Sequence, residues 1–144
     1  MRAKIANSGL DLWAMLAAAI LATLVLVAAT QMEAQSFTVL HTFTAGADGA
    51  NPSADGLAID AAGNLCGATS SEGAHNSSNV FKLSPANGGW TYSSLYDFTG
   101  GSDGSSPGSG LVIDGQGNLF GTTYIGGSGQ GYSVYGVVFE IAPN

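Results

Sequence analysis

The chain has one long apolar run near its N-terminus and, beyond residue 34, short stretches rich in β-branched and aromatic residues. The apolar run, residues 12–29, holds no charged residue and is rich in Ala and Leu, which favours a helix. No window beyond residue 34 shows the 3.6-residue period of an amphipathic helix. The pattern therefore predicts an all-β fold after an N-terminal signal helix.

Residues 1–34 have the features of an export signal. Arg2 and Lys4 precede the apolar run, as the positive residues of a secretory signal do. Cleavage is expected after Ala34, with cleavage after Ala29 as the alternative. The run of 18 residues also suits an uncleaved signal-anchor, because a helix of that length spans about 27 Å. Both interpretations place the rest of the chain outside the cytoplasm, in the periplasm, at the cell surface or in the medium.

A sequence repeat organises the chain after residue 34. Residues 40–44 (LHTFT) match 95–99 (LYDFT) at an offset of 55, and a glycine-rich turn with an aspartate follows each. Further matches join 56–60 with 110–114, 63–65 with 117–119 and 80–83 with 138–141. Because a fixed period of this length indicates repeated supersecondary units, we predict repeat unit one over residues 35–91 and repeat unit two over residues 92–144.

Each unit is expected to form four short antiparallel strands. The expected strands are 37–43, 57–60, 65–69 and 80–83 in unit one, and 92–98, 111–114, 119–124 and 137–141 in unit two. Such units resemble β-propeller blades, and propellers typically close with about four to eight blades. Two units cannot close, so the chain is expected to pack as two sheets, to assemble with other copies, or to belong to a truncated array.

Three phrases carry a resemblance to a known family: residues 95–104 (LYDFTGGSDG), 117–123 (GNLFGTT) and 80–85 (VFKLSP). They resemble the bacterial choice-of-anchor tandem repeat called GloVer, over nearly the whole chain after residue 34. The resemblance implies an exported, surface-associated, propeller-like repeat protein, and it carries over no catalytic residue. Unit one departs from the pattern at Cys66, where unit two has Phe120.

The composition narrows the range of partners. The chain has 3 Lys+Arg against 10 Asp+Glu, a net charge of -7, and Lys82 is its last cation. It cannot neutralise a row of phosphates, so we expect no nucleic-acid partner. We also expect no small-molecule cofactor, and membrane contact only through the N-terminal segment if that segment stays uncleaved. The sole cysteine, Cys66, is predicted to be a small buried residue, without an internal disulfide.

Most candidates for chemistry have a simpler structural interpretation. Residues 104–108 (GSSPG) fit the G-x-S-x-G pattern of hydrolases, but Pro107 follows the serine where a helix should begin. His41 matches Tyr96 and is predicted to be a packed, hydrogen-bonded ring. His75 is predicted to lie in a solvated loop.

The acidic residues recur most regularly. Asp48 and Asp103 stand in glycine-rich turns, while Asp60 and Asp114 stand at hairpins, where their carboxylates can accept hydrogen bonds from turn amides. We predict turn formation for all four, with weak calcium binding as the alternative. Lys82 corresponds to Glu140, and a site built on charge would not reverse its sign between the copies, so this face is predicted to be solvated.

The aromatic residues divide into two groups. Those that recur with the repeat are predicted to form the core, namely Phe43, Phe81, Phe98, Phe120 and Phe139. Those that do not recur are assigned to packing, with carbohydrate or protein contact as the alternative, namely Trp90, Tyr124, Tyr132 and Tyr135. We therefore predict no catalytic, cofactor-binding or metal-binding residue.

The leading functional hypothesis is an exported tandem-repeat protein that is not an enzyme and acts in surface binding or as an extracellular structural element. Its partner would be a carbohydrate, another protein or a second copy, and the strand at 137–141 offers an open edge for self-association. The alternative is a fragment of an exported β-propeller enzyme whose active residues lie on other blades.

Overall fold

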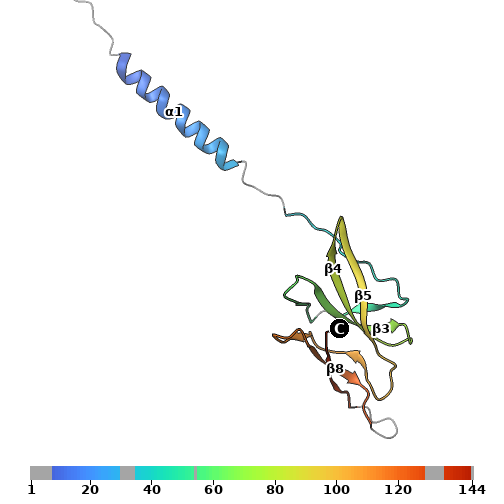
Figure 1. The fold of residues 1–144 in the computed structure, drawn as a ribbon. Helices are drawn as coiled ribbons and strands as arrows, with labels where there is room; N and C mark the ends of the chain where they lie inside the picture. Colours follow the sequence, from blue (N-terminus) through green and yellow to red (C-terminus); the bar gives the residue numbers. More distant parts are fainter. Residues whose placement is uncertain (1–7, 30–34, 54, 129–134, 144) are drawn as a thin grey trace, which may run out of the picture. The chain divides into compact units, whose positions relative to one another are not determined.

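The computed structural model describes residues 8–29, 35–53, 55–128 and 135–143 (Figure 1). In these residues the chain forms one helix and nine strands. It divides into two compact units, Met1–Thr38 and Val39–Asn144, of which the first holds the helix and the second all the strands. A mostly β chain after an N-terminal helix is therefore confirmed.

The helix α1 (Ser8–Ala29) contains the whole predicted apolar run and begins four residues before it. Asp11 lies in its first turn, where a carboxylate interacts favourably with the helix dipole. Among the described residues, no helix meets the combined requirement of length and apolarity for crossing a membrane. The predicted cleavage site after Ala34 and the cations Arg2 and Lys4 lie outside the described residues.

The first sheet has five antiparallel strands: β1 (Asp48–Pro52), β2 (Ala58–Ile59), β3 (Leu65–Gly73), β4 (Asn79–Ala86) and β5 (Gly89–Asp97). The order is β1-β3-β4-β5, and β2 also pairs with β3. The short strands β1 and β2 both pair with β3, β1 with residues 69–73 and β2 with residues 65–66. They therefore lie one after the other along β3. The opposite edge of the sheet is β5, beside β4.

The second sheet has four antiparallel strands: β6 (Ser105–Pro107), β7 (Val112–Ile113), β8 (Leu119–Ile125) and β9 (Val138–Ile141). Here β6 and β7 share the long strand β8, and β9 also pairs with β8. The second sheet thus repeats the first strand for strand, with one difference. In the described residues no strand lies beyond β9, at the place that β5 takes beside β4.

The structure corrects the predicted strands in two places. Residues 37–43, expected to be a strand, have no regular secondary structure. In contrast, β1 and β6 form in stretches that were expected to be turns. These strands are irregular, with positive φ at Gly49 (79°), Asn51 (53°) and Ser106 (52°), which conceals them in the sequence. The sheets therefore have five and four strands instead of four each, and the described residues form no closed propeller.

One of the predicted strands belongs to the sheet of the other unit. The segment predicted as the first strand of unit two, residues 92–98, lies mostly in β5, which pairs with β4 over residues 79–86. A strand from the second sequence unit therefore completes the sheet of the first.

A single hydrophobic core joins the two sheets. Its buried members are Cys66, Ala68, Val80, Phe98, Leu111 and Leu119. Phe98 follows β5 and is only 1% exposed, and its ring packs against that of Phe139 in β9 with centroids 5.3 Å apart. Of the other recurring aromatics, Phe81 is also buried, whereas Phe43, Phe120 and Phe139 are partly buried. The predicted core is therefore confirmed for Phe81 and Phe98 and only in part for the other three.

Glycine at the centre of each long strand makes room for an aromatic ring on the next strand. Gly67 pairs with Phe81, and its counterpart Gly121 pairs with Phe139. A Cβ atom at Gly67 would lie 2.6 Å from the Phe81 ring, and one at Gly121 would lie 2.5 Å from the Phe139 ring. The bare backbone of β8 therefore fixes the position of Phe139, which lines the candidate site.

Candidate functional site

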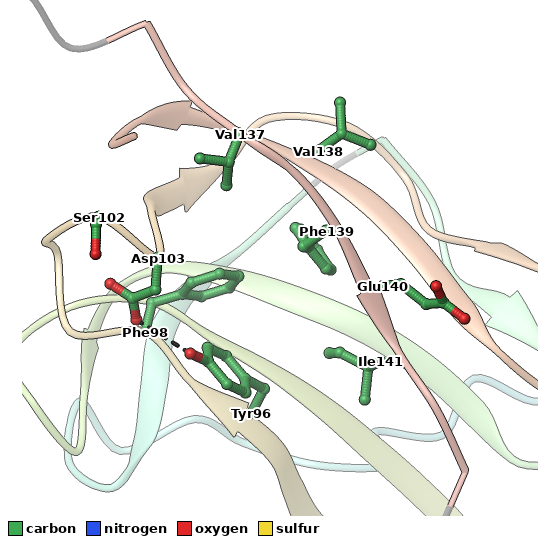
Figure 2. Close-up of a pocket in the computed structure, with 9 residues that line it drawn as sticks. All are labelled: Tyr96, Phe98, Ser102, Asp103, Val137, Val138, Phe139, Glu140 and Ile141. Carbon is green, nitrogen blue, oxygen red and sulfur yellow. Dashed lines mark hydrogen bonds between the residues drawn. The ribbon is translucent and has the colours of Figure 1, made fainter. Parts of the chain in front are cut away.

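A hollow of about 400 Å³ lies along β9 (Figure 2). Three segments of the chain line it. They are the end of β5 with the residue that follows it (Tyr96 and Phe98), the next turn (Ser102 and Asp103), and residues 137–141. The rings of Tyr96 and Phe98 meet edge to face, with centroids 5.0 Å apart. The hollow is thus largely apolar, with the Asp103 carboxylate at its margin.

Asp103 is held as a carboxylate by the turn that carries it. Its oxygens accept hydrogen bonds from the Thr99 hydroxyl (2.6 Å), the Thr99 amide (2.8 Å) and the Gly101 amide (3.2 Å). Burial acts to raise the pKa of Asp103, but the hydrogen bonds from Thr99 prevail and lower it. The Tyr96 hydroxyl donates to the same carboxylate at 3.3 Å, which orients the ring at the wall of the hollow.

Asp48 makes the equivalent arrangement in the first sheet. Its carboxylate accepts from the Thr44 hydroxyl (2.7 Å) and the Thr44 amide (3.0 Å), and His41 Nε2 lies 3.2 Å away. Its pKa is lowered as well, because these hydrogen bonds outweigh the effect of burial, which acts to raise it. The prediction that His41 is a packed, hydrogen-bonded ring is therefore confirmed.

In the first sheet, the space equivalent to the hollow is occupied by the side chain of Tyr92. Its ring stacks on His41, with centroids 4.8 Å apart, and lies nearly parallel to the Phe81 ring at 6.0 Å. The Tyr92 hydroxyl accepts from Asn79 Nδ2 at 2.8 Å and donates to the Asp48 carbonyl at 3.2 Å. Burial raises the pKa of Tyr92, so the hydroxyl stays protonated as this donor.

The walls of the two spaces correspond residue by residue. The repeat pairs the wall residues His41, Phe43, Asp48 and Phe81 of the filled space with Tyr96, Phe98, Asp103 and Phe139 of the hollow. Asn79 corresponds to Val137, since the backbone amide of each donates to a threonine hydroxyl on the neighbouring long strand, at 3.1 and 3.0 Å. The hollow of the second sheet therefore corresponds to the space that Tyr92 occupies in the first sheet, and no described strand fills it.

The hairpin aspartates have the predicted role in turns. Asp60 accepts from the amides of Ala62 and Asn64 (both 2.9 Å) and from Asn64 Nδ2 (2.7 Å). Asp114 repeats this with Gln116 and Asn118 at distances of 2.8 to 2.9 Å. The asparagine side chain is the main cause of the lowered pKa of each aspartate.

The other candidates are distributed over the molecule. The Ser106 hydroxyl donates to the Ser70 carbonyl (3.3 Å), and its strand β6 leads into no helix. His75 is exposed in the turn between β3 and β4, as predicted. Cys66 is buried as predicted, and burial raises the pKa of its thiol. In the described part of the chain, no three His, Cys, Asp or Glu side chains gather in a way that could hold a metal ion.

Of the non-recurring aromatics that the structure describes, none lines the hollow, but Tyr135 lines a neighbouring one together with Val137 and Val138. Tyr124 and Tyr135 are 79% and 82% exposed, Trp90 is partly buried on β5, and Tyr132 lies outside the described residues. Packing is therefore not shown for the two exposed tyrosines.

Sequence reasoning missed the pair that matters most at this site. Continuing the offset of 55 by three residues toward the N-terminus aligns Phe37 with Tyr92. The repeat offset was therefore enough to align the two residues, although they differ in polarity. Nothing in the sequence, however, shows that the Tyr92 side chain fills a space between strands.

The comparisons with known proteins agree with the repeat organisation. The family model described as the Gloeobacter/Verrucomicrobia repeat matches residues 25–144. Neither the search of curated proteins nor the search of solved structures found a match. Because the family model covers most of the chain, the chain belongs to the Gloeobacter/Verrucomicrobia (GloVer) repeat family.

Proposed function

We propose that the chain is an exported, non-catalytic repeat protein whose two blade-like sheets serve surface binding or an extracellular structural role. The observation that carries this proposal is the outer edge of β9. Val138 is 80% exposed there, and β9 pairs only with β8 among the described strands. The hollow along this edge offers aromatic contact next to unpaired backbone groups.

An open edge of this kind suits a protein partner that contributes a strand. Unpaired N–H and C=O groups of an edge strand form a template for another chain, and adjacent pockets give such an added strand its specificity. The first sheet already shows the arrangement, because β5 pairs with β4 while Tyr92 enters the space beside it. Among the partners expected from the sequence, we therefore favour a protein strand over a carbohydrate.

A structural role is also supported by the use of the repeated polar residues. The four aspartates that recur between the units each accept several hydrogen bonds from their own turn, for example Asp48 from Thr44 and Asp114 from Asn118. Carboxylates fixed in this way define the loops between strands. Asp103 lines the hollow and accepts a hydrogen bond from Tyr96, so it holds that wall in place, which suits a preformed binding surface.

Export is supported by the N-terminal sequence, and a fusion tests it. Alkaline phosphatase, which folds only after export, is joined after Asn144 of the full chain, and a matched fusion carries Arg2→Glu and Lys4→Glu. We expect phosphatase activity from the first fusion and a clear loss from the second, because a signal needs its positive start. An inactive first fusion together with an active cytoplasmic reporter at the same junction would contradict the proposal.

A further inference from the structure

We propose that the partner of the β9 edge is a second copy of this chain, whose residues 37–41 add a strand beside β9 and whose Phe37 ring fills the hollow. This inference rests on the proposed function, since it names the occupant of the same edge. It is carried by the register of the repeat, by the shape and polarity of the hollow, and by the state of residues 37–41 in the described structure.

The register follows from the first sheet. In the repeat alignment, residues 37–41 correspond to residues 92–96 of β5, and β9 corresponds to residues 80–83 of β4. In the first sheet β4 and β5 pair as Val80↔Tyr96, Phe81↔Ser94, Lys82↔Ser93 and Leu83↔Tyr92. The corresponding pairs between two copies are Val138 with His41, Phe139 with Val39, Glu140 with Thr38, and Ile141 with Phe37.

This register brings Phe37 to the hollow. Tyr92 lies against His41 and Phe81 in the first sheet, and the counterparts of these two residues, Tyr96 and Phe139, line the hollow in Figure 2. Phe37 is the residue that the repeat aligns with Tyr92, so its ring would lie between the same two walls. A phenyl ring there covers aromatic surface that is otherwise open to water.

The space beside β4 has a polar wall residue and a polar occupant, whereas the hollow beside β9 has an apolar wall residue and an apolar proposed occupant. The Tyr92 hydroxyl needs a partner, and Asn79 Nδ2 donates to it at 2.8 Å. In the hollow, the place of Asn79 is taken by Val137, which offers no hydrogen bond, and the aligned occupant Phe37 has no hydroxyl to satisfy. A Tyr hydroxyl in the hollow would lack the amide donor that Asn79 supplies to Tyr92, so this hollow favours Phe over Tyr. Phe37 of this chain meets that preference.

Residues 37–41 are available for such a contact. Phe37 is 92% exposed and Val39 is 62% exposed, and neither lies in regular secondary structure. Their continuation is already in place, since Phe43 packs on Phe81 at 5.1 Å just as Phe98 packs on Phe139 at 5.3 Å. Residues 35–43 contain no Asp, Glu, Lys or Arg, so they approach an acidic second copy without charge repulsion.

The contact joins two different surfaces. Each copy offers residues 37–41 at one place and accepts them along β9 at another, so the interface is head to tail. Such an interface closes into a ring when the rotation permits, and otherwise extends into a filament.

The test is sedimentation of the full chain, expressed with its N-terminal segment and compared in one processed form that mass spectrometry verifies. We expect the wild type to associate with rising concentration and Phe37→Ser to weaken association at least about tenfold, from the lost burial of one ring. Ile59→Ser is the matched control, because Ile59 is apolar and 67% exposed but lies on β2 of the first sheet. It should associate like the wild type.

A pair of substitutions tests the polarity match. Val137→Asn and Phe37→Tyr should each weaken association, because each introduces one half of the Asn–Tyr hydrogen bond without the other. The double variant recreates the Asn79–Tyr92 pair and should recover most of the loss.

Three results would overturn the inference: a wild type that stays monomeric, association unchanged by Phe37→Ser, or a double variant no better than the weaker single variant. A monomeric protein that is still exported would refute the inference and leave the proposed function intact. Association of this kind in a protein that fails the export test would refute the proposed function alone.

Discussion

At Gly121 a side chain is excluded by the Phe139 ring on the opposing strand. A Cβ atom there would lie 2.5 Å from that ring and 2.9 Å from the Leu111 side chain. We predict that Gly121→Ala lowers the free energy of unfolding by about 1–3 kcal/mol, because the ring must shift from a packed position. Urea unfolding of wild type and variant measures the difference.

Gly115 provides the matched control. A Cβ atom at Gly115 meets nothing within 4 Å, so Gly115→Ala should change the free energy of unfolding by less than about 0.5 kcal/mol. Equal effects of the two substitutions would mean that the ring does not depend on the bare backbone of β8.

The turn aspartates make stability depend on pH. The pKa values of Asp48, Asp60, Asp103 and Asp114 are all lowered in the folded state. A group with a lowered folded pKa stabilises the fold above its unfolded pKa, which is about 3.9 for Asp, and loses that contribution as the pH falls through the folded pKa. We therefore predict a urea midpoint that is level from about pH 7 to pH 5 and falls below about pH 4.

Asp114→Asn tests the source of that fall. The amide removes one of the four titrating carboxylates, so the variant should lose less stability than the wild type between neutral and acid pH. An unchanged slope would show that Asp114 does not contribute to the pH dependence.

At the scale of the element, Tyr92 and Asn79 connect β5 to β4. The Tyr92 hydroxyl bonds both Asn79 Nδ2 and the Asp48 carbonyl. We predict that Tyr92→Phe lowers the free energy of unfolding by about 1–2 kcal/mol, because Asn79 loses a buried partner. Thermal or urea unfolding provides the measurement.

The double variant Asn79→Val with Tyr92→Phe introduces the residue pair that we assign to the second sheet. Its destabilisation should be smaller than the sum of the two single effects by at least about 0.5 kcal/mol. Strict additivity would show that the two side chains do not act as a pair.

The elements that the sequence predicts well are those specified by local chemistry. The hairpin turns at Asp60 and Asp114 and the strands β3, β4 and β8 follow from turn residues and apolar stretches. The short strands β1 and β6 escaped prediction, because their glycine, proline and positive-φ residues are typical of turns.

Residues 37–43 show a second reason why prediction from the sequence fails. Their sequence is typical of a strand, yet a strand forms only where an edge is available for pairing. The candidate site could not be predicted for the same reason: among the described strands none lies beside the outer edge of β9, and no periodicity in the sequence shows that such a position is open. Only the pairing of β5 with β4 shows which residues belong there.

At the scale of the whole molecule, the first sheet includes a strand from the next sequence unit. Residues of unit two complete the first sheet through β5, and we propose that residues 37–41 of a second copy complete the second sheet in the same way. In this proposal the glycine-rich turns of Asp48 and Asp103 hold the walls between which the rings of Tyr92 and Phe37 are placed.

A site-specific disulfide between copies tests this claim most directly. Thr38→Cys and Glu140→Cys are prepared on separate, differently tagged chains and mixed under oxidising conditions. The buried thiol of Cys66, 2% exposed, should not compete. The proposed register places residues 38 and 140 directly opposite each other, with Cα atoms about 4.5–5.5 Å apart, within the range of a disulfide.

Thr38→Cys mixed with Val138→Cys is the control, because two further residues along β9 move the Cα atom beyond about 7 Å. Non-reducing electrophoresis and mass spectrometry of the linked peptides give the result. The account predicts a 38–140 link between copies and little or no 38–138 link. Absence of the 38–140 link, or equal yields of both, would contradict it.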